Sequence, residues 1–320
     1  MRDETATTGT AAANPAGHAA VASASATRAA GHAPSWAAHG AMLLFAALIS
    51  VSFSLGQRAA PHIAPEALTV ARFIVAAIVI GALGAGRMRT HHFASPWRYG
   101  LLGGLLGGYF VLMFVALRLT DPVSTSAVFT LIPAMSAIFG WMLLRQVTTP
   151  RMALSLSLAG AGAVWVIFRG DIDAILGFEI GRGEAIFFFG CAMHAFYTPL
   201  VRRLNRGEPV IVFTFGTLIG GLVIAGLWGA RQTLATDWTA LPPVVWAAVF
   251  YLGIFTTAGT FYLVQFSTMR LKAGTVMAYG YLTPSFVILL EGVFAGQWVA
   301  PPVWLGVAAT AAALLLLLRD

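Results

Sequence analysis

The chain has 320 residues, of which 58% are hydrophobic and 10% charged, and its formal net charge is +7. So apolar a composition excludes a soluble globular domain and predicts an integral membrane protein that crosses the bilayer many times. The basic residues lie in short segments between apolar runs, with no patch of interleaved basic and aromatic residues, so nucleic acid is not an expected partner.

Residues 1–35 form an Ala/Thr/Ser/Gly-rich stretch without an apolar run. It lacks the apolar core of a signal peptide and cannot bury a hydrophobic core, so we predict a disordered N-terminal tail. Its few charges are compatible with a cytoplasmic location.

Ten segments of about 20 mostly apolar residues follow, the length that a helix needs to cross a bilayer. Prolines stand near several of their starts, where a helix tolerates them. The predicted spans are 36–57, 65–85, 98–117, 122–144, 150–168, 183–201, 209–229, 243–268, 273–296 and 301–318.

The basic residues indicate the orientation of these spans. With the N-terminus inside, thirteen lie on the inner side, five on the outer side, and Arg72 lies within a span, which accounts for all 19. The five outer residues are Arg58, Arg118, Arg169, Arg182 and Arg231. The excess on the inner side predicts that both termini are cytoplasmic and that the 169–184 segment is external.

The chain also repeats itself. Residues 116–133 (ALRLTDPVSTSAVFTLIP) resemble residues 268–284 (TMRLKAGTVMAYGYLTP), which aligns Pro133 with Pro284 at an offset of 151. Nearer each start, Phe53 and Arg58 match Tyr197 and Arg202 at an offset of 144. We therefore predict an all-α fold of two five-helix repeats, 36–170 and 183–320. An odd number of spans inverts the second repeat and places the working site between the two.

The motifs of soluble enzymes are missing from the sequence. It contains no HExxH, GxSxG or phosphate-binding loop, and Cys191 is the only cysteine. We therefore expect no enzymatic activity, no cofactor and no metal site. The glycines in LLGGLLGGY (residues 101–109) instead have the spacing that lets two membrane helices approach closely.

A polar stripe marks the predicted substrate site. His194 lies near the middle of its span and Thr198 is one turn further on, while the offset of 144 pairs them with Ser50 and Ser54. An ionisable group inside the membrane generally faces a cavity, so we predict that these four residues bind substrate. The alternative for the hydroxyls is a hydrogen bond to their own or a neighbouring helix.

Two tyrosines complete the predicted substrate-binding set. Tyr262 and Tyr279 lie in the eighth and ninth spans, where their rings would stack on a substrate or contact an amine. The alternative is that they face lipid or pack in the protein.

Three titratable residues inside spans are further candidates. His194 is a candidate carrier of a coupling proton because imidazole titrates near neutral pH. Glu291 is a second candidate, unless it reaches toward the external headgroups. Arg72 would bind an anionic group of the substrate, or else serve the structure by pairing with a helix end.

The order of these patterns, repeated over ten spans, resembles the EamA branch of the drug/metabolite transporter superfamily. The resemblance is carried by residues 53–57, 64–81 and 124–133 in the first repeat and by 183–203, 253–271 and 281–284 in the second. It implies a secondary transporter that exports or takes up small metabolites, often amino acids, across the bacterial inner membrane. We predict an exporter of amino acids or similar small metabolites. Its expected partners are the lipid bilayer and a small-molecule substrate, with a coupling proton as a further candidate. A nucleotide-sugar or multidrug carrier, or a scaffold or sensor without transport activity, is the alternative.

Overall fold

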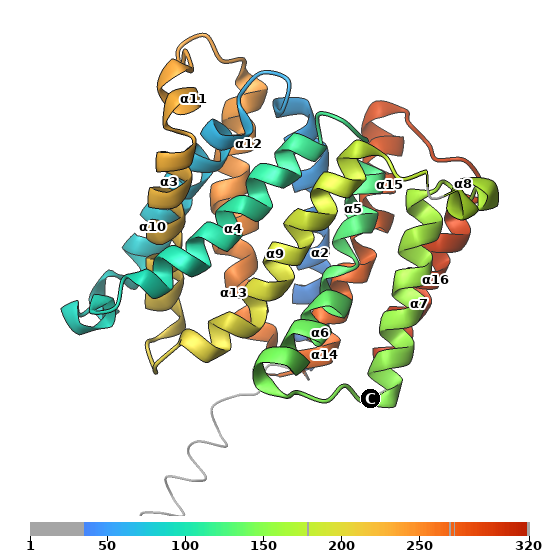
Figure 1. The fold of residues 1–320 in the computed structure, drawn as a ribbon, viewed down its shortest axis with the longest axis horizontal. Helices are drawn as coiled ribbons and strands as arrows, with labels where there is room; N and C mark the ends of the chain where they lie inside the picture. Colours follow the sequence, from blue (N-terminus) through green and yellow to red (C-terminus); the bar gives the residue numbers. More distant parts are fainter. Residues whose placement is uncertain (1–34, 178, 269, 272, 319–320) are drawn as a thin grey trace, which may run out of the picture.

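A computed structural model describes residues 35–177, 179–268, 270–271 and 273–318, which are helical apart from short connections (Figure 1). The tail predicted over residues 1–35 therefore lies outside the described residues, except for Ser35. Nine helices in the described part are long and apolar enough to cross a membrane, and the shorter apolar helix Val303–Leu317 follows them. This confirms the predicted all-α membrane fold.

The first half contains the helices that correspond to the first five predicted spans. They are α2 (Ser35–Ala59), α3 (Pro65–Gly84), α4 (Trp97–Ala116), α5 (Pro122–Phe129) with α6 (Ile132–Leu144), and α7 (Pro150–Ile167). The short helices η1 (Ala85–Arg87), η2 (Thr90–Phe93) and α8 (Ile172–Leu176) lie in connections. Asp121 and Thr149 cap α5 and α7 by accepting hydrogen bonds from backbone N–H groups, and a proline follows each cap.

The second half follows the same plan. Its helices are α9 (Arg182–Leu204), α10 (Val210–Trp228), α12 (Pro243–Gly253) continued by η3 (Ile254–Gly259) and α13 (Thr260–Thr268), α14 (Ala273–Ala278) continued by η4 (Tyr279–Leu282) and α15 (Thr283–Ala295), and α16 (Val303–Leu318). The short helix α11 (Ala230–Ala235) lies in a connection.

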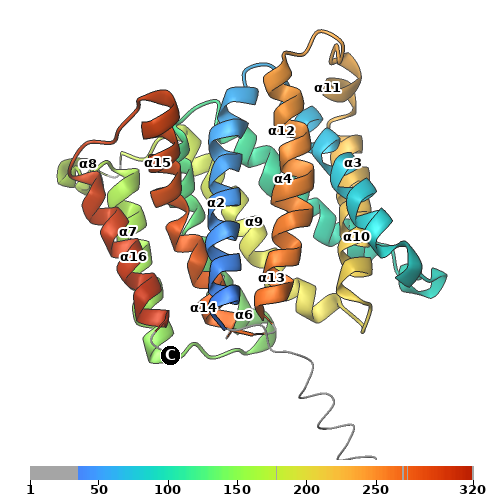
Figure 2. The same cartoon turned by 180° about the vertical axis from the view of Figure 1, so that it is seen from behind.

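Successive spans run in opposite directions, so the start of α2 and the end of α16 lie on the same face (Figures 1 and 2). We call this the terminal face, which also carries the connections 85–96, 145–149 and 205–209. The opposite side, the far face, carries connections 60–64, 117–121, 229–242 and 296–302. Helix α2 runs from the terminal face to the far face and α9 runs back, which is the inversion that the odd number of spans predicted.

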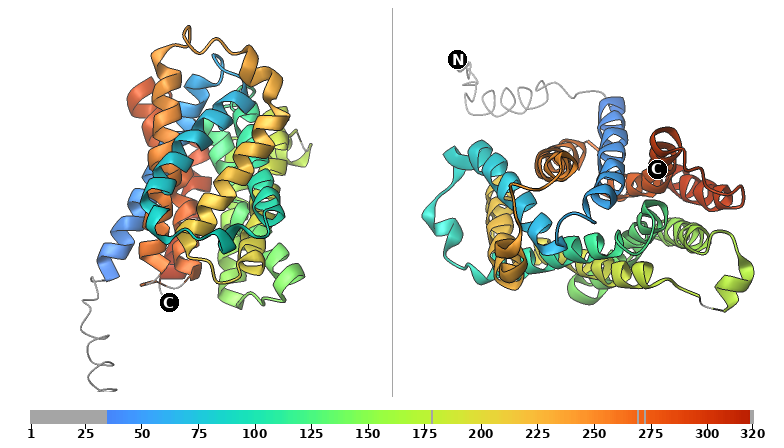
Figure 3. Two further views of the ribbon diagram at one scale, coloured as in Figure 1. Left: turned by 90° about the vertical axis from the view of Figure 1, so that its left-hand side faces the viewer. Right: turned by 90° about the horizontal axis from the view of Figure 1, so that it is seen from above.

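Contacts between the halves are paired as expected for two inverted copies. Helix α2 packs on α13 and α15 of the second half, and its counterpart α9 packs on α4 and α6 of the first. The two second spans, α3 and α10, pack on each other, as do the two fifth spans, α7 and α16. Figure 3 shows the latter pair standing at one end of the molecule, beyond the remaining helices.

Matched prolines interrupt the fourth span of each half. Pro133 stands in the first turn of α6 and Pro284 in the first turn of α15. Because proline lacks an N–H donor, one backbone hydrogen bond of a continuous helix is lost at each position. The span 122–144 is split between α5 and α6, and the span 273–296 is split by the tighter turns of η4.

Small residues determine how closely α4 packs on two helices of the second half. A Cβ atom added to Gly103 of α4 would lie 2.0 Å from the backbone nitrogen of Gly221 in α10. One added to Gly108 would lie 2.2 Å from the methyl carbon of Met193 in α9. The glycine-rich stretch therefore permits close helix contact, as predicted, and fixes α4 between its two neighbours in the second half.

Candidate functional site

A cavity of about 720 Å³ lies between the two halves. Helices α2, α3, α4, α9, α10 and α13 supply most of its wall, and η3, the connection 205–209 and the broken fourth spans supply the remainder. It reaches the terminal face beside Arg202, Asn205 and Glu208, whereas its described lining residues include none from the far-face connections. A cavity of this size matches those that bind small organic molecules.

Arg72 of α3 is the buried cation of this cavity, with 2% of its surface exposed. Its guanidinium carbon lies 3.5 Å from the centre of the Phe110 ring, a cation–π contact. Its Nε donates to the hydroxyl of Thr257 at 3.3 Å, and its Nη2 donates to that hydroxyl and to Thr256. The remaining nitrogen, Nη1, is buried and has no hydrogen-bond partner among the described residues.

A local change of helix type places these two threonines. The segment η3 is a π-helix, in which each backbone hydrogen bond spans five residues instead of the four of an α-helix. The hydroxyls of Thr256 and Thr257 both donate to the carbonyl of Leu252, at 2.9 Å each, and thus present their lone pairs to Arg72. Both threonines also line the cavity. Sequence periodicity gave no sign of the π-turn, because Ile254–Gly259 reads as an ordinary apolar span.

His194 of α9 lines the cavity, as predicted, and Thr198 lines it one turn away. The imidazole lies against the ring of Tyr109, 4.8 Å between centroids, and against Tyr197, at 5.8 Å. Its Nδ1 is buried without a hydrogen-bond partner. The hydroxyl of Thr198 donates to the carbonyl of His194, which is the alternative that the sequence left open for the hydroxyls.

The other predicted substrate-binding residues lie outside the described lining of the cavity. Ser50 is fully buried and donates to the carbonyls of Ala46 and Thr283, so it joins α2 to α15. Ser54 is buried on the same helix. Ser50, which the repeat offset had placed in the cavity, thus lies in the contact between α2 and α15 instead.

The two tyrosines are placed differently from each other. Tyr279 is buried, and its hydroxyl lies 2.7 Å from Nδ1 of His39, in a contact between the halves. Tyr262 is 68% exposed and stacks on Phe266, which is the position of a lipid-facing ring. Helical spacing alone could not distinguish the cavity side of these helices from the other sides. Substrate binding by any of the six residues stays a prediction.

Glu291 belongs to a set of polar contacts near the far face. Its buried carboxylate lies 3.7 Å from the guanidinium of Arg58, which joins α15 to α2. A second contact between the halves joins the hydroxyl of Thr120 to the carboxylate of Glu184 at the start of α9. Arg118 also donates to the carbonyls of Ala60 and Ile63, at 2.7 and 2.8 Å, and holds the α2–α3 connection.

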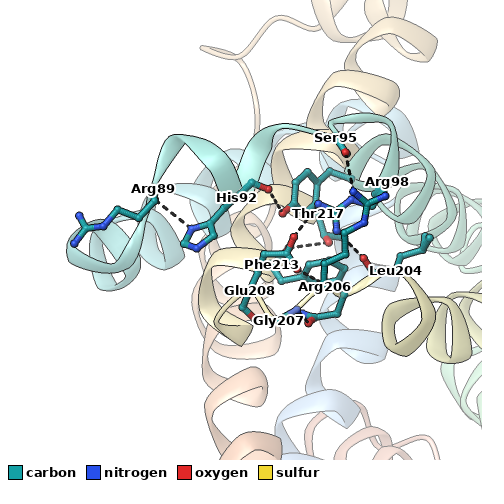
Figure 4. Close-up of polar contacts among 12 residues, drawn as sticks. Arg89, His92, Ser95, Arg98, Leu204, Arg206, Gly207, Glu208, Phe213 and Thr217 are labelled. Carbon is teal, nitrogen blue, oxygen red and sulfur yellow. Dashed lines mark hydrogen bonds and ion pairs between the residues drawn. The ribbon is translucent and has the colours of Figure 1, made fainter.

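An ion pair lies where the cavity meets the terminal face (Figure 4). Arg98 of α4 donates to the Glu208 carboxylate at 2.8 Å and to the carbonyl of Leu204 at 2.6 Å. The other carboxylate oxygen accepts from the backbone N–H of Arg206. Burial raises the pKa of Glu208, but the hydrogen bonds from Arg98 and Arg206 together outweigh it, so the pKa lies below its ordinary value. No local sequence pattern marks this pair, since its members are 110 residues apart.

Comparison with known proteins defines the class. The model of the EamA-like transporter family matches residues 36–168 and 181–319. The chain therefore belongs to the EamA-like transporter family and is a membrane transporter of the drug/metabolite superfamily. The two matched stretches contain all ten predicted spans.

Two individual proteins illustrate the relationship. The chain is 27% identical over 224 residues to the uncharacterized transporter YyaM of Bacillus subtilis (strain 168), a match that covers 68% of this chain and 72% of that protein. A crystal structure at 20% sequence identity superposes with a TM-score of 0.63 and covers 87% of this chain and 95% of the other. The second likeness supports the fold alone.

Proposed function

We propose that this protein is a secondary active transporter that exports amino acids or similar small metabolites by alternating access. The observation that carries the proposal is the cavity of about 720 Å³ between two inverted halves, which reaches the terminal face but not the far-face connections. Two inverted copies provide two equivalent conformations when they exchange roles, and alternating access requires such a pair.

The proposed orientation of the protein in the membrane rests on the distribution of its basic residues. The terminal face carries the larger share of the basic residues, so we place it and both termini in the cytoplasm of a bacterium, with the protein in the inner (cell) membrane. The cavity is then open to the cytoplasm, where a metabolite made in the cell enters. This is why we propose export as the direction.

His194 and Glu291 are the residues that we propose to test for proton coupling. His194 lines the cavity and therefore meets whichever compartment the cavity opens to. Glu291 is buried beside Arg58 and would exchange a proton only when the far face opens. We therefore assign the coupling proton to His194 first.

The experiment is flux into proteoliposomes loaded with a panel of amino acids, amines and nucleotide sugars. We expect counterflow of at least one labelled solute above protein-free liposomes. The matched control is the double variant Cys191→Ala, Thr198→Cys, whose single cysteine lies in the cavity wall. A maleimide attached to this cysteine should block the cavity and stop the flux. Flux that equals protein-free liposomes for every solute, with and without a pH gradient, would contradict transport and favour a scaffold or sensor.

A further inference from the structure

The cavity contains a buried positive charge that the described residues do not neutralise. Arg72 has 2% of its surface exposed, and the ion pairs of the described part involve Arg58, Arg98 and Arg169 instead. Its partners are two hydroxyls, at 3.2 to 3.4 Å, and the face of Phe110. A cation in an apolar membrane span is expensive unless an anion or water meets it.

The guanidinium also has hydrogen-bonding capacity left over. Nη1 has no hydrogen-bond partner although it is buried, and the threonine contacts are longer than the charge-assisted bonds that Arg forms with oxygen anions. Because the cavity wall includes Arg72, an anion inside the cavity would be adjacent to this group. A carboxylate matches the fork of a guanidinium and binds it through two parallel hydrogen bonds.

The surroundings restrict the rest of the ligand. Phe110, Tyr109 and Phe129 line the cavity together with several aliphatic side chains. His194 lies against Tyr109, the neighbour of Phe110 in sequence, and its Nδ1 is likewise buried without a partner. The wall around Arg72 therefore combines a buried cation and the imidazole of His194 with a largely apolar surface, while Arg202 and Glu208 line the end of the cavity at the terminal face.

We propose that Arg72 is the receptor for the carboxylate of the transported solute, and that the substrate class is small carboxylates with an apolar or aromatic body. Both free acids and zwitterionic amino acids belong to this class. The inference rests on the proposed transport function, since it assigns the substrate of the same cavity. It differs from a purely structural role, in which Arg72 would only hold the π-turn through Thr256 and Thr257.

The test compares acids with their amides on the purified full-length protein. The probes are L-phenylalanine with L-phenylalaninamide, benzoate with benzamide, and 4-methylvalerate with 4-methylvaleramide, each at about 10 mM, because a ligand that binds the folded state raises Tm. We expect at least one acid to raise Tm while its amide does not. The comparison on the unaltered protein needs no variant and is informative even if a substitution at Arg72 prevents folding.

Two variants then locate the effect. In Arg72→Gln the acid should no longer raise Tm, and in Arg72→Lys its affinity should fall at least about tenfold, because a lysine keeps the charge but not the fork. Arg118→Gln, which removes an arginine near the far face, is the control and should leave acid binding unchanged. Amides that bind as well as acids, acid binding that survives in Arg72→Gln, or no shift with any of the acids would each overturn the assignment.

The two proposals fail in different ways. Proteoliposome flux of a neutral or cationic solute, with no acid binding, would leave transport standing and remove the carboxylate receptor. Arg72-dependent acid binding without flux of any solute would leave the receptor standing and remove transport.

Discussion

The far face and the terminal face are built from equivalent positions of the two halves, yet their polar contacts differ. Near the far face, Arg58 pairs with Glu291 and Thr120 with Glu184. By the repeat offsets of 144 and 151, the terminal-face residues equivalent to Arg58 and Glu291 are Arg202 and Gly140. Those equivalent to Thr120 and Glu184 are Leu271 and Gly40. Both glutamates are thus replaced by glycine on the side where the cavity opens.

This difference teaches that inverted halves need not give two conformations of equal energy. Contacts present on one face alone stabilise the state in which that face is closed. An ion pair or charged hydrogen bond that is partly exposed contributes about 1 kcal/mol, so two of them favour one state by about thirtyfold. The terminal face has an ion pair of its own, Arg98 with Glu208, but it joins α4 to the α9–α10 connection, beside helices that already pack closely.

The first prediction concerns the contribution of the Arg98–Glu208 ion pair on the terminal face to the stability of the fold. Glu208→Gln should lower the free energy of unfolding by about 3 kcal/mol near neutral pH, because it leaves the buried Arg98 without its anion. The pKa of Glu208 is lowered in the fold, so this stabilisation is present above the unfolded pKa and is lost as pH falls through the folded pKa.

Thermal unfolding in detergent at about pH 7.5 and about pH 4 measures this dependence. The original protein should be more stable than Glu208→Gln by the full amount at the higher pH, and this difference in stability should be smaller at the lower pH. Glu179→Gln, at an exposed carboxylate, is the control. A difference that grows as pH falls would contradict the ion-pair account.

The second prediction removes the far-face contacts. Glu184→Gln with Glu291→Gln should shift the protein by about thirtyfold toward the state open at the far face. Ser54→Cys and Thr198→Cys, equivalent positions in a Cys191→Ala background, report the change through labelling by an impermeant maleimide. Position 54, buried in this structure, should react faster from the far side, and position 198 should react more slowly from the terminal side. Unchanged rates at both positions would show that the two glutamates do not hold the far face closed.

The third prediction builds the missing contact. Gly140→Glu places a carboxylate at the position equivalent to Glu291, where Arg202 is the matching cation, and should slow labelling of Thr198→Cys about fivefold. An added Cβ meets only the end of the Gln146 side chain, at 3.2 Å, which can move. Gly40→Glu is the control. Its added Cβ has open space, and Leu271, the residue equivalent to the Thr120 partner of Glu184, has no side-chain donor for the new carboxylate. Equal effects of the two substitutions would mean that added charge, not pairing, is responsible.

The smallest expected effect concerns the helix ends on the two faces. Arg145 ends α6 and Gly296 ends α15 at equivalent positions, both in left-handed conformation, with φ of 55° and 68°. Gly296→Ala should therefore destabilise the protein by about 1 kcal/mol through backbone strain alone, because its Cβ would have open space. Thermal unfolding measures it against Gly86→Ala, which also has open space but no positive φ. An equal loss of stability in both variants would argue against strain.

Much of the fold was predictable because it depends on local and repeated signals. Ten apolar stretches, the matched Pro133 and Pro284 and the glycine pattern around Gly103 each have a direct structural consequence. The side chains of the site depend on which face of a helix meets the cavity, and that is decided by packing between distant segments. His194 could be predicted to face a cavity because an ionisable residue at mid-membrane is rare, whereas Tyr262 has the same spacing whether it faces lipid or the cavity.

Other parts of the site carried no sequence signal at all. The π-turn at Ile254–Gly259 places Thr256 and Thr257 on Arg72, and nothing in that apolar stretch distinguishes it from an α-helix. The Arg98–Glu208 pair joins residues far apart in the chain, so only the assembled fold reveals it. Among the described residues no anion pairs with Arg72, and this feature, on which the carboxylate proposal rests, is likewise a property of the packed structure.

The most direct test of alternating access is a pair of distance measurements between spin labels, in lipid nanodiscs, with and without Glu184→Gln and Glu291→Gln. One label pair spans the far face at positions 62 and 297, and the other spans the terminal face at the equivalent positions 206 and 146. We predict that the two substitutions lengthen the far-face distance and shorten the terminal-face distance, because closing one face must open the other. If both distances stay the same, or both lengthen together, the halves do not exchange roles and alternating access is contradicted.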